Sequence, residues 1–154
     1  MLVTQQEIID IVKKGKDNNE TFVVTNGCFD ILHVGHVRYL QKTKEYADKL
    51  IVMLNSDLSV KKLKGINRPI NNQNDRAELL SALSCVDYVV LFEEESPAEL
   101  LGKINPNVYT KGADYTMETL PERDVVIKNN IKVEFIEFVE GKSTTNVIKK
   151  INEK

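Results

Sequence analysis

Two histidines, the only ones in the chain, lie three residues apart in the segment His33-Val34-Gly35-His36. The segment follows an apolar run of strand length that leads into residues 26–30, Asn-Gly-Cys-Phe-Asp. A strand, a glycine-containing turn and the first turn of a helix together present backbone N–H groups and a positive dipole end to a phosphate. The sequence therefore predicts a phosphate-binding turn that contains both imidazoles.

These residue types suit the transfer of a phosphorus-bearing group. When an anionic phosphate attacks the α-phosphorus of a nucleoside triphosphate, the transition state needs positioned donors and cations rather than a covalent nucleophile. An imidazole can donate an N–H to phosphate oxygens, and its pKa of about 6.5 lets it become charged when a polyphosphate arrives. We therefore expect His33 and His36 to be catalytic, and Gly35 to let the nucleotide approach the backbone.

The same residues have alternative roles. The histidines could be helix caps or two metal ligands, although the chain has no third histidine and neither cysteine has suitable spacing. Cys28 could be a nucleophile, but it lacks a separate histidine as its base, which favours a small side chain that closes the strand. Asp30 could hold a substrate hydroxyl or a magnesium-bound hydroxyl, or it could cap the turn.

Cations and hydroxyls elsewhere could meet further phosphates. Residues 59–74 form a polar stretch without helical periodicity, and its lysines at 61–64 either bind phosphate or form a solvated face. Arg76 could hold a phosphate through two hydrogen bonds or pair with an acidic neighbour. Residues 143–145, Ser-Thr-Thr, open a predicted helix, where they would form a second anion site or a plain N-cap.

The elements that would position these residues alternate along the chain. Apolar runs of strand length are separated by stretches with helix caps and helical spacing, which is typical of consecutive βαβ units. The expected strands cover residues 21–25, 49–54, 87–92, 107–111 and 132–138, and the expected helices cover about 4–14, 37–46, 75–83, 121–129 and 144–151, with another opening at Ser96. We predict an α/β, Rossmann-like, doubly wound parallel five-stranded sheet whose last strand lies at an edge. Ligands of such sheets bind at the carboxyl ends of the strands, where the polar residues occur.

Length and composition limit the alternatives. With 154 residues the chain is predicted to form a single domain, residues 1–154, with an N-terminal helix at about 4–14 and a nucleotide-binding core at about 21–151. A formal net charge of −2 argues against a nucleic-acid binder. No stretch approaches the roughly 20 apolar residues of a membrane span, and two cysteines without C-x-x-C spacing favour a reducing compartment. We therefore expect a cytoplasmic protein that binds neither nucleic acid nor membrane.

Several motifs occur in order along most of the chain and together resemble a known family. They are NGCFDILHVGH at 26–36, LNSD at 54–57, KGxxRPIN at 64–71, DRA at 75–77, KGADY at 111–115 and GxSTTN at 141–146. This set resembles the heptose 1-phosphate adenylyltransferases of the HxGH nucleotidylyltransferase superfamily. The resemblance implies the HxGH nucleotidylyltransferase fold and transfer of AMP from ATP to D-glycero-D-manno-heptose 1-phosphate. The implied products are pyrophosphate and ADP-heptose, a precursor of lipopolysaccharide or related glycans.

The resemblance also implies partners and residue roles. It implies Mg²⁺ held mainly by the triphosphate with no metal site on the protein, a separate sugar kinase that supplies the acceptor, and a homodimer. The implied catalytic residues are His33, His36 and Lys62. The implied nucleotide-binding residues are Cys28, Phe29, Asp30, Gly35, His36, Lys111, Gly112, Asp114, Ser143, Thr144 and Thr145. The implied acceptor-binding residues are Asp30, Asn55, Lys62, Lys64 and Arg76.

Two other functions compete with this interpretation. The glycerol-3-phosphate cytidylyltransferases share the H-x-G-H turn and the Ser-Thr-Thr tail, but their tail carries an arginine that residues 138–141 lack, and Ile148 stands where they place a basic residue. A nucleotide-binding module without turnover is the second alternative. The presence of the H-x-G-H turn, the lysine stretch and the Ser-Thr-Thr tail in one chain speaks against it.

Overall fold

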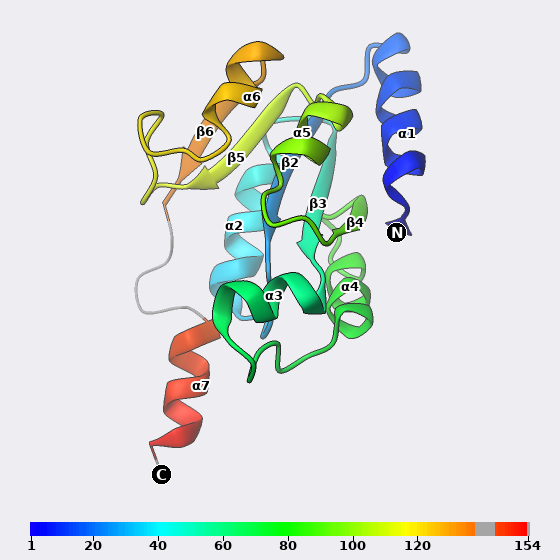
Figure 1. Ribbon diagram of the computed structural model, residues 1–154. Coiled ribbons are helices and arrows are strands. Elements are labelled where there is room, and N and C mark those ends of the chain that lie inside the picture. The colour runs from blue at the N-terminus through cyan, green and yellow to red at the C-terminus, as the bar shows by residue number, and fades with distance from the viewer. Residues whose placement is uncertain (138–143, 154) are drawn as a thin grey trace.

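A six-stranded, all-parallel sheet forms the centre of the protein in a computed structural model that describes residues 1–137 and 144–153. The strand order is β1-β4-β3-β2-β5-β6 (Figure 1). The strands are β1 (Leu2–Val3), β2 (Phe22–Gly27), β3 (Lys49–Asn55), β4 (Tyr88–Phe92), β5 (Val108–Gly112) and β6 (Lys132–Ile136). The α/β fold, the parallel sheet and the edge position of β6 are confirmed.

The predicted count of five strands is wrong because β1 was missed. Its two residues add a parallel edge strand beside β4, with Leu2 opposite Val89 and Val3 opposite Val90. Two residues are too few to show strand periodicity, so only the pairing with a distant strand identifies them. The five predicted strands occur within a few residues of their expected bounds.

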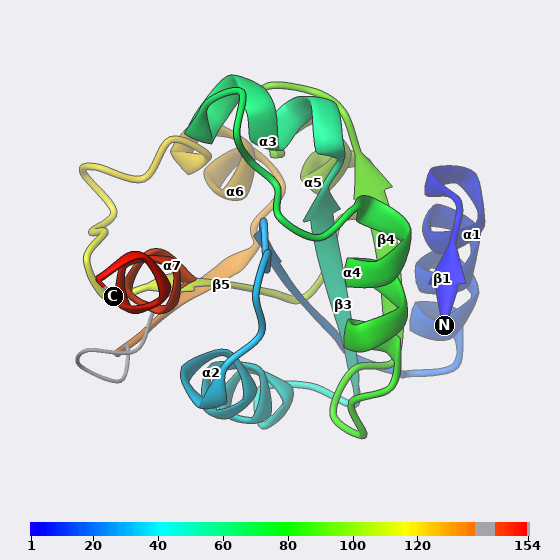
Figure 2. The ribbon, with the colours of Figure 1, turned by 90° about the horizontal axis from the view of Figure 1, so that it is seen from below.

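Helices cover both faces of the sheet, as the doubly wound prediction requires. The helices of the described residues are α1 (Gln5–Asp17), α2 (Val34–Lys44), α3 (Asp57–Lys64), α4 (Gln73–Ser81), α5 (Ala98–Ile104), α6 (Arg123–Lys128) and α7 (Thr144–Asn152). One apolar cluster joins the sheet to α1, α5 and α6, and another joins its other face to α2 and α4. Figure 2 shows α5 and α6 on the side of the sheet opposite α2. Within the described ranges, no helix is long and apolar enough to cross a membrane.

Burial on both faces explains the apolar strands. Phe22, Val23 and Val24 of β2 and the run from Leu50 to Leu54 in β3 have no exposed surface. Because side chains alternate between the two faces of a strand, such runs supply both apolar clusters at once. β2 and β3 therefore form a rigid centre whose carboxyl ends carry the H-x-G-H turn and residues 55–57.

The first part of residues 59–74, expected to be irregular, is helical instead. Helix α3 begins after Ser56, whose hydroxyl accepts a hydrogen bond from the backbone N–H of Ser59 at 3.2 Å. Val60 is the apolar residue that this helix buries completely. A single buried apolar position does not produce the repeat of three to four residues by which a helix is recognised in a sequence. Residues 65–72 remain outside helices and strands and lead to α4.

Candidate active site

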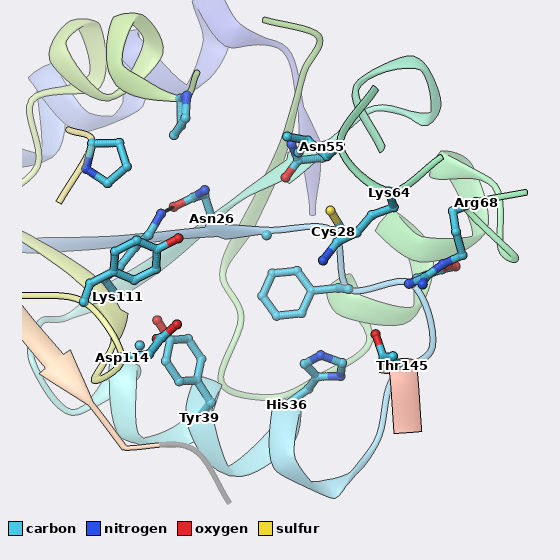
Figure 3. A pocket seen from close by; sticks show the side chains of 18 of the residues that line it. Asn26, Cys28, His36, Tyr39, Asn55, Lys64, Arg68, Lys111, Asp114 and Thr145 are labelled. Carbon is cyan, nitrogen blue, oxygen red and sulfur yellow. Dashed lines mark hydrogen bonds and ion pairs between the residues drawn. The ribbon is translucent and has the colours of Figure 1, made fainter. Parts of the chain in front are cut away.

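A cavity of about 770 Å³ opens at the carboxyl ends of the central strands (Figure 3). Segments that are far apart in the sequence form its walls: the end of β2, the start of α2, the end of α3, the end of β5 and the start of α7. Twelve predicted site residues line it: Cys28, Phe29, Asp30, His33, Gly35, His36, Asn55, Lys64, Lys111, Gly112, Asp114 and Thr145. Polar residues from several strand ends therefore lie together at one edge of the sheet, as predicted.

The two imidazoles cap helix α2 and stack on each other. His33 is the N-cap residue, and its Nδ1 accepts a hydrogen bond from the backbone N–H of Gly35 at 3.1 Å. The backbone N–H of His33 donates in turn to Nδ1 of His36 at 3.3 Å. The ring centroids lie 3.8 Å apart with 25° between the planes. Because each Nδ1 is an acceptor, the proton of each neutral ring resides on Nε2.

The surroundings of His36 keep its ring neutral. Burial, and to a smaller extent the nearby His33, together lower the pKa of His36 from 6.5 to about 4. The ring of Phe29 also packs against His36, with centroids 5.2 Å apart. Phe29 has φ of 45°, a left-handed conformation that is costly for an aromatic residue and that recurs at functional sites. A Cβ on Gly27 would lie 2.8 Å from the Phe29 ring, so a glycine is needed there.

Asp30 fastens residues 65–72 to the H-x-G-H turn. Its carboxylate is almost fully buried and accepts hydrogen bonds from Nε of Arg68 at 2.8 Å and from the backbone N–H groups of Ile70 and Asn71 at 2.9 Å. Burial alone would raise the pKa of Asp30, but the hydrogen bonds from Asn71 and Ile70 and the Arg68 charge hold it below its usual value. The carboxylate therefore holds a separate segment, a role that differs from both predictions, a ligand of a hydroxyl and a cap of its own turn.

The cations of the lysine stretch divide between the cavity and the solvent. Lys64, the last residue of α3, lines the cavity, and so does Arg68, which the sequence analysis did not select. Lys62 is exposed and is not part of the cavity wall. Of the three lysines, the structure brings Lys64 to the cavity wall and does not bring Lys61 or Lys62 there.

Arg76 lies in the interior rather than in the cavity. Its side chain has no exposed surface. Nε donates to the backbone carbonyl of Asn71 at 2.9 Å, and Nη1 donates to the carbonyls of Cys28 and Asn55 at 2.7 and 2.8 Å. Nη2 forms an ion pair with Asp57 at 2.8 Å. Arg76 thus ties the ends of β2 and β3 to the loop before α4, and the structure does not bring it to the predicted acceptor site.

A buried ion pair stands at the opposite end of the cavity. Nζ of Lys111 lies 3.0 Å from Oε1 of Glu122, with 15% and 1% of the two side chains exposed. The hydroxyl of Tyr109 also donates to Glu122, at 3.0 Å, and is hydrogen-bonded to Asn26. Burial and then the Glu122 charge raise the pKa of Tyr109 well above its usual value, so the phenol stays protonated. Nζ of Lys111 also lies 5.1 Å from the centre of the Tyr115 ring.

The sequence analysis selected Lys111 from its motif but missed Glu122. Glu122 precedes α6, after an irregular segment, and no spacing rule links it to Lys111. The other cavity residues that were not selected are Asn26, Gly27, Tyr39, Leu63, Arg68, Glu95, Ser96, Pro97, Tyr115 and Pro121. Some of them, such as Asn26 and Arg68, stand inside the quoted motifs but were given no role, whereas residues 95–97 and Pro121 lie in connecting segments.

The remaining predicted residues lie at the margins of the cavity. Cys28 is half-buried and has no disulfide partner, and burial raises the pKa of its thiol, which favours the small closing side chain over the nucleophile. Asp114, just after the end of β5, and Thr145, at the start of α7, also line the cavity. Ser143 and the side chain of Thr144 lie outside the described residues.

Comparisons with known proteins agree with this geometry. The chain is 46% identical over 147 residues to the bifunctional protein HldE of Syntrophotalea carbinolica and 51% identical over 150 residues to that of Aliarcobacter butzleri. These alignments cover 96% and 97% of this chain but only 30% and 31% of the relatives. The chain thus spans about 30% of the length of the curated relatives it matches.

A solved structure and a family model match as well. The lipopolysaccharide core biosynthesis protein from Thermoplasma volcanium GSS1 is 31% identical and superposes with a TM-score of 0.62 over 78% of this chain and 97% of that protein. A family model described as cytidylyltransferase-like matches residues 24–150, which include the H-x-G-H turn and most of the cavity wall. The chain therefore belongs to the cytidylyltransferase-like family.

Proposed function

We propose that this chain transfers AMP from ATP to D-glycero-D-manno-heptose 1-phosphate, releasing pyrophosphate and forming ADP-heptose. The observation that carries the proposal is the H-x-G-H turn itself. His33 and His36 stand at the start of α2 inside the cavity, and backbone hydrogen bonds fix each ring so that Nε2 bears the proton. The similarity to the HldE proteins supports the nucleotide and the acceptor.

The proposed reaction is a direct in-line displacement. An oxygen of the acceptor phosphate bonds to the α-phosphorus of ATP, while the bond from that phosphorus to the bridging oxygen breaks and pyrophosphate leaves. The imidazole N–H groups of His33 and His36 and the positive end of α2 stabilise the negative charge that spreads over the oxygens. The protein needs no covalent intermediate, in agreement with the raised pKa of the Cys28 thiol.

The two ends of the cavity suggest how ATP would lie in it. We assign the nucleoside to the end lined by Lys111, Gly112 and Asp114, and the phosphates of ATP to the end lined by the histidines and Thr145. At the phosphate end the helices α2 and α7 begin, and backbone N–H groups at helix starts suit anions. Ser143 and Thr144 belong to this proposal through the motif resemblance alone.

Magnesium would enter as part of the ATP substrate. In the described part of the chain, no group of three or more His, Cys, Asp and Glu side chains could hold a metal ion. Asp30, which is buried among its own hydrogen bonds, is a poor ligand. We further propose a homodimer in the cytoplasm that receives its acceptor from a separate sugar kinase.

A substrate grid tests the proposal. The purified protein is incubated with ATP, CTP, GTP or UTP and with heptose 1-phosphate, in either anomer, or glycerol 3-phosphate, and pyrophosphate is measured. We expect the fastest release with ATP and heptose 1-phosphate. A preference for CTP and glycerol 3-phosphate would replace the proposal with cytidylyl transfer, and no release from any pair would leave only nucleotide binding.

A further inference from the structure

Arg68 is a cavity residue whose position is determined by Asp30, which lies just before the H-x-G-H turn. It belongs to residues 65–72, which form neither helix nor strand. Its side chain is nevertheless largely buried, with only 15% of it exposed. Asp30 accepts from its Nε and from two backbone N–H groups of the same segment. The side-chain amide of Asn71 also donates to the backbone carbonyl of Asp30 at 2.8 Å. These contacts place the guanidinium at a set point beside the turn.

The outer nitrogens of this guanidinium face the cavity. Nε is the nitrogen that Asp30 binds, and among the described residues neither Nη1 nor Nη2 of Arg68 has a hydrogen-bond partner. Arg68 and Lys64 both line the cavity, and Figure 3 shows both side chains directed inward, on the side where His36 and Thr145 lie. Two parallel N–H donors in a rigid plane match the oxygens of a terminal phosphate.

The contrast with Arg76 strengthens this interpretation. Both arginines lie close to the turn, but Nε, Nη1 and Nη2 of Arg76 all donate to protein atoms inside the structure. Arg76 therefore has a structural role. Arg68 donates Nε to Asp30, and we assign its Nη1 and Nη2 to another partner. A guanidinium held in this way loses little conformational freedom when an anion binds.

On this geometry we propose that Arg68 binds the phosphate of the acceptor substrate, and that Asp30 is its positioning residue. The assignment rests on the proposed function. The proposed function places the triphosphate at the starts of α2 and α7, whereas Arg68 and Lys64 come from the segment that links β3 to α4. Their two positive charges match the two negative charges of a phosphate monoester, which must be held against repulsion from ATP.

Steady-state kinetics of Arg68→Ala test the assignment. KM for heptose 1-phosphate should rise on the order of 10- to 100-fold, because a charge-assisted pair of hydrogen bonds is lost, while KM for ATP changes by less than about 3-fold. Arg68→Lys keeps the positive charge but loses the two parallel N–H donors of the guanidinium. Its KM for heptose 1-phosphate should therefore lie between those of the wild type and Arg68→Ala. Arg38→Ala, which removes an exposed arginine outside the cavity, is the matched control and should change neither constant.

A double-mutant cycle tests the positioning role. Asp30→Asn should raise KM for the acceptor in the wild-type background, but it should add little once Arg68 is already alanine, because the two residues act as a unit. A role for Asp30 in folding alone would give the same effect in both backgrounds and would contradict the proposal. Circular dichroism of each variant verifies that the fold is kept.

Binding without turnover separates this proposal from the proposed function. Calorimetry measures the affinity of heptose 1-phosphate in the absence of ATP, for the wild type and for Arg68→Ala. Weaker acceptor binding by the variant supports the assignment even if no pyrophosphate is ever formed. Equal acceptor affinity in an enzyme that does transfer AMP, or a rise confined to KM for ATP, would overturn it.

Discussion

His33 and His36 each use Nδ1 for structure, and the proposed function uses Nε2 of each ring for chemistry. Nδ1 accepts a backbone N–H at the start of α2, so a proton can be placed there only by breaking that hydrogen bond. The cap therefore determines the tautomer that presents an N–H to a phosphate. The two roles considered from the sequence, cap and transition-state donor, are compatible in one ring.

The pKa of His36 is a residue-level prediction. In the free protein, NMR titration of the ring should give a pKa of about 4, because burial and the nearby His33 disfavour the charged form. Between about pH 6.5 and 4 the unfolded chain then binds a proton that the folded chain refuses, so the free energy of unfolding falls as the pH is lowered through this range.

An added polyphosphate supplies the control for this titration. Pyrophosphate bound at the turn should raise the pKa of His36, since a nearby anion favours the imidazolium form. A midpoint near 6.5 in the free protein, unmoved by pyrophosphate, would mean that the ring is neither buried nor close to the anion.

At the residue scale, sequence patterns identified the residues of the H-x-G-H motif. They did not identify which lysine and arginine side chains enter the cavity. The H-x-G-H spacing placed both histidines and Gly35 at the cavity because the motif contains its own turn. Lys62, Lys64, Arg68 and Arg76 look alike as cations in a sequence. Which of them enters the cavity depends on the loop path after α3, and that path is determined by Asp30 through tertiary hydrogen bonds.

At the level of elements, the Lys111–Glu122 pair joins the end of β5 to the start of α6. The pair is almost fully buried and also holds the hydroxyl of Tyr109, so it connects the sheet to the segment that closes one end of the cavity. Replacing Glu122 by alanine would leave the ammonium group of Lys111 in a largely buried place without its counter-charge.

Chemical denaturation measures this effect. Glu122→Ala should lower the free energy of unfolding by about 3–5 kcal/mol, the usual cost of breaking a buried pair from one side. Glu99→Ala breaks the ion pair with Lys103 on α5, whose side chains are mostly exposed, and should cause a much smaller loss. Equal losses in the two variants would show that Lys111 is solvated and that the pair does not hold the cavity wall.

Prediction of the elements succeeded where the pattern was long. The apolar runs of β2 and β3 are buried on both faces and could be recognised as parallel strands before any contact was known. The cap of α1 was also predicted correctly, since the Thr4 hydroxyl accepts from the backbone N–H of Glu7 at 3.1 Å. β1 was missed because it has two residues and is identified only by its pairing with a distant strand. α3 was missed because it is short and fully buries a single apolar side chain, that of Val60.

At the level of the whole molecule, the parallel sheet explains why the site could be anticipated. Parallel strands end at one edge, so the H-x-G-H turn, Asn55 and Lys111 had to meet once the strand order was set. The closing walls could not be predicted in the same way. Glu95, Pro97 and Pro121 reach the cavity through connections whose paths depend on packing.

The turnover of His36→Ala tests the central claim most directly. Pyrophosphate release from ATP and heptose 1-phosphate should fall about a hundredfold, because the variant loses a transition-state donor worth on the order of 3 kcal/mol. Circular dichroism should show the wild-type fold. A folded His36→Ala variant with near-normal turnover would contradict the claim that the H-x-G-H turn carries the chemistry.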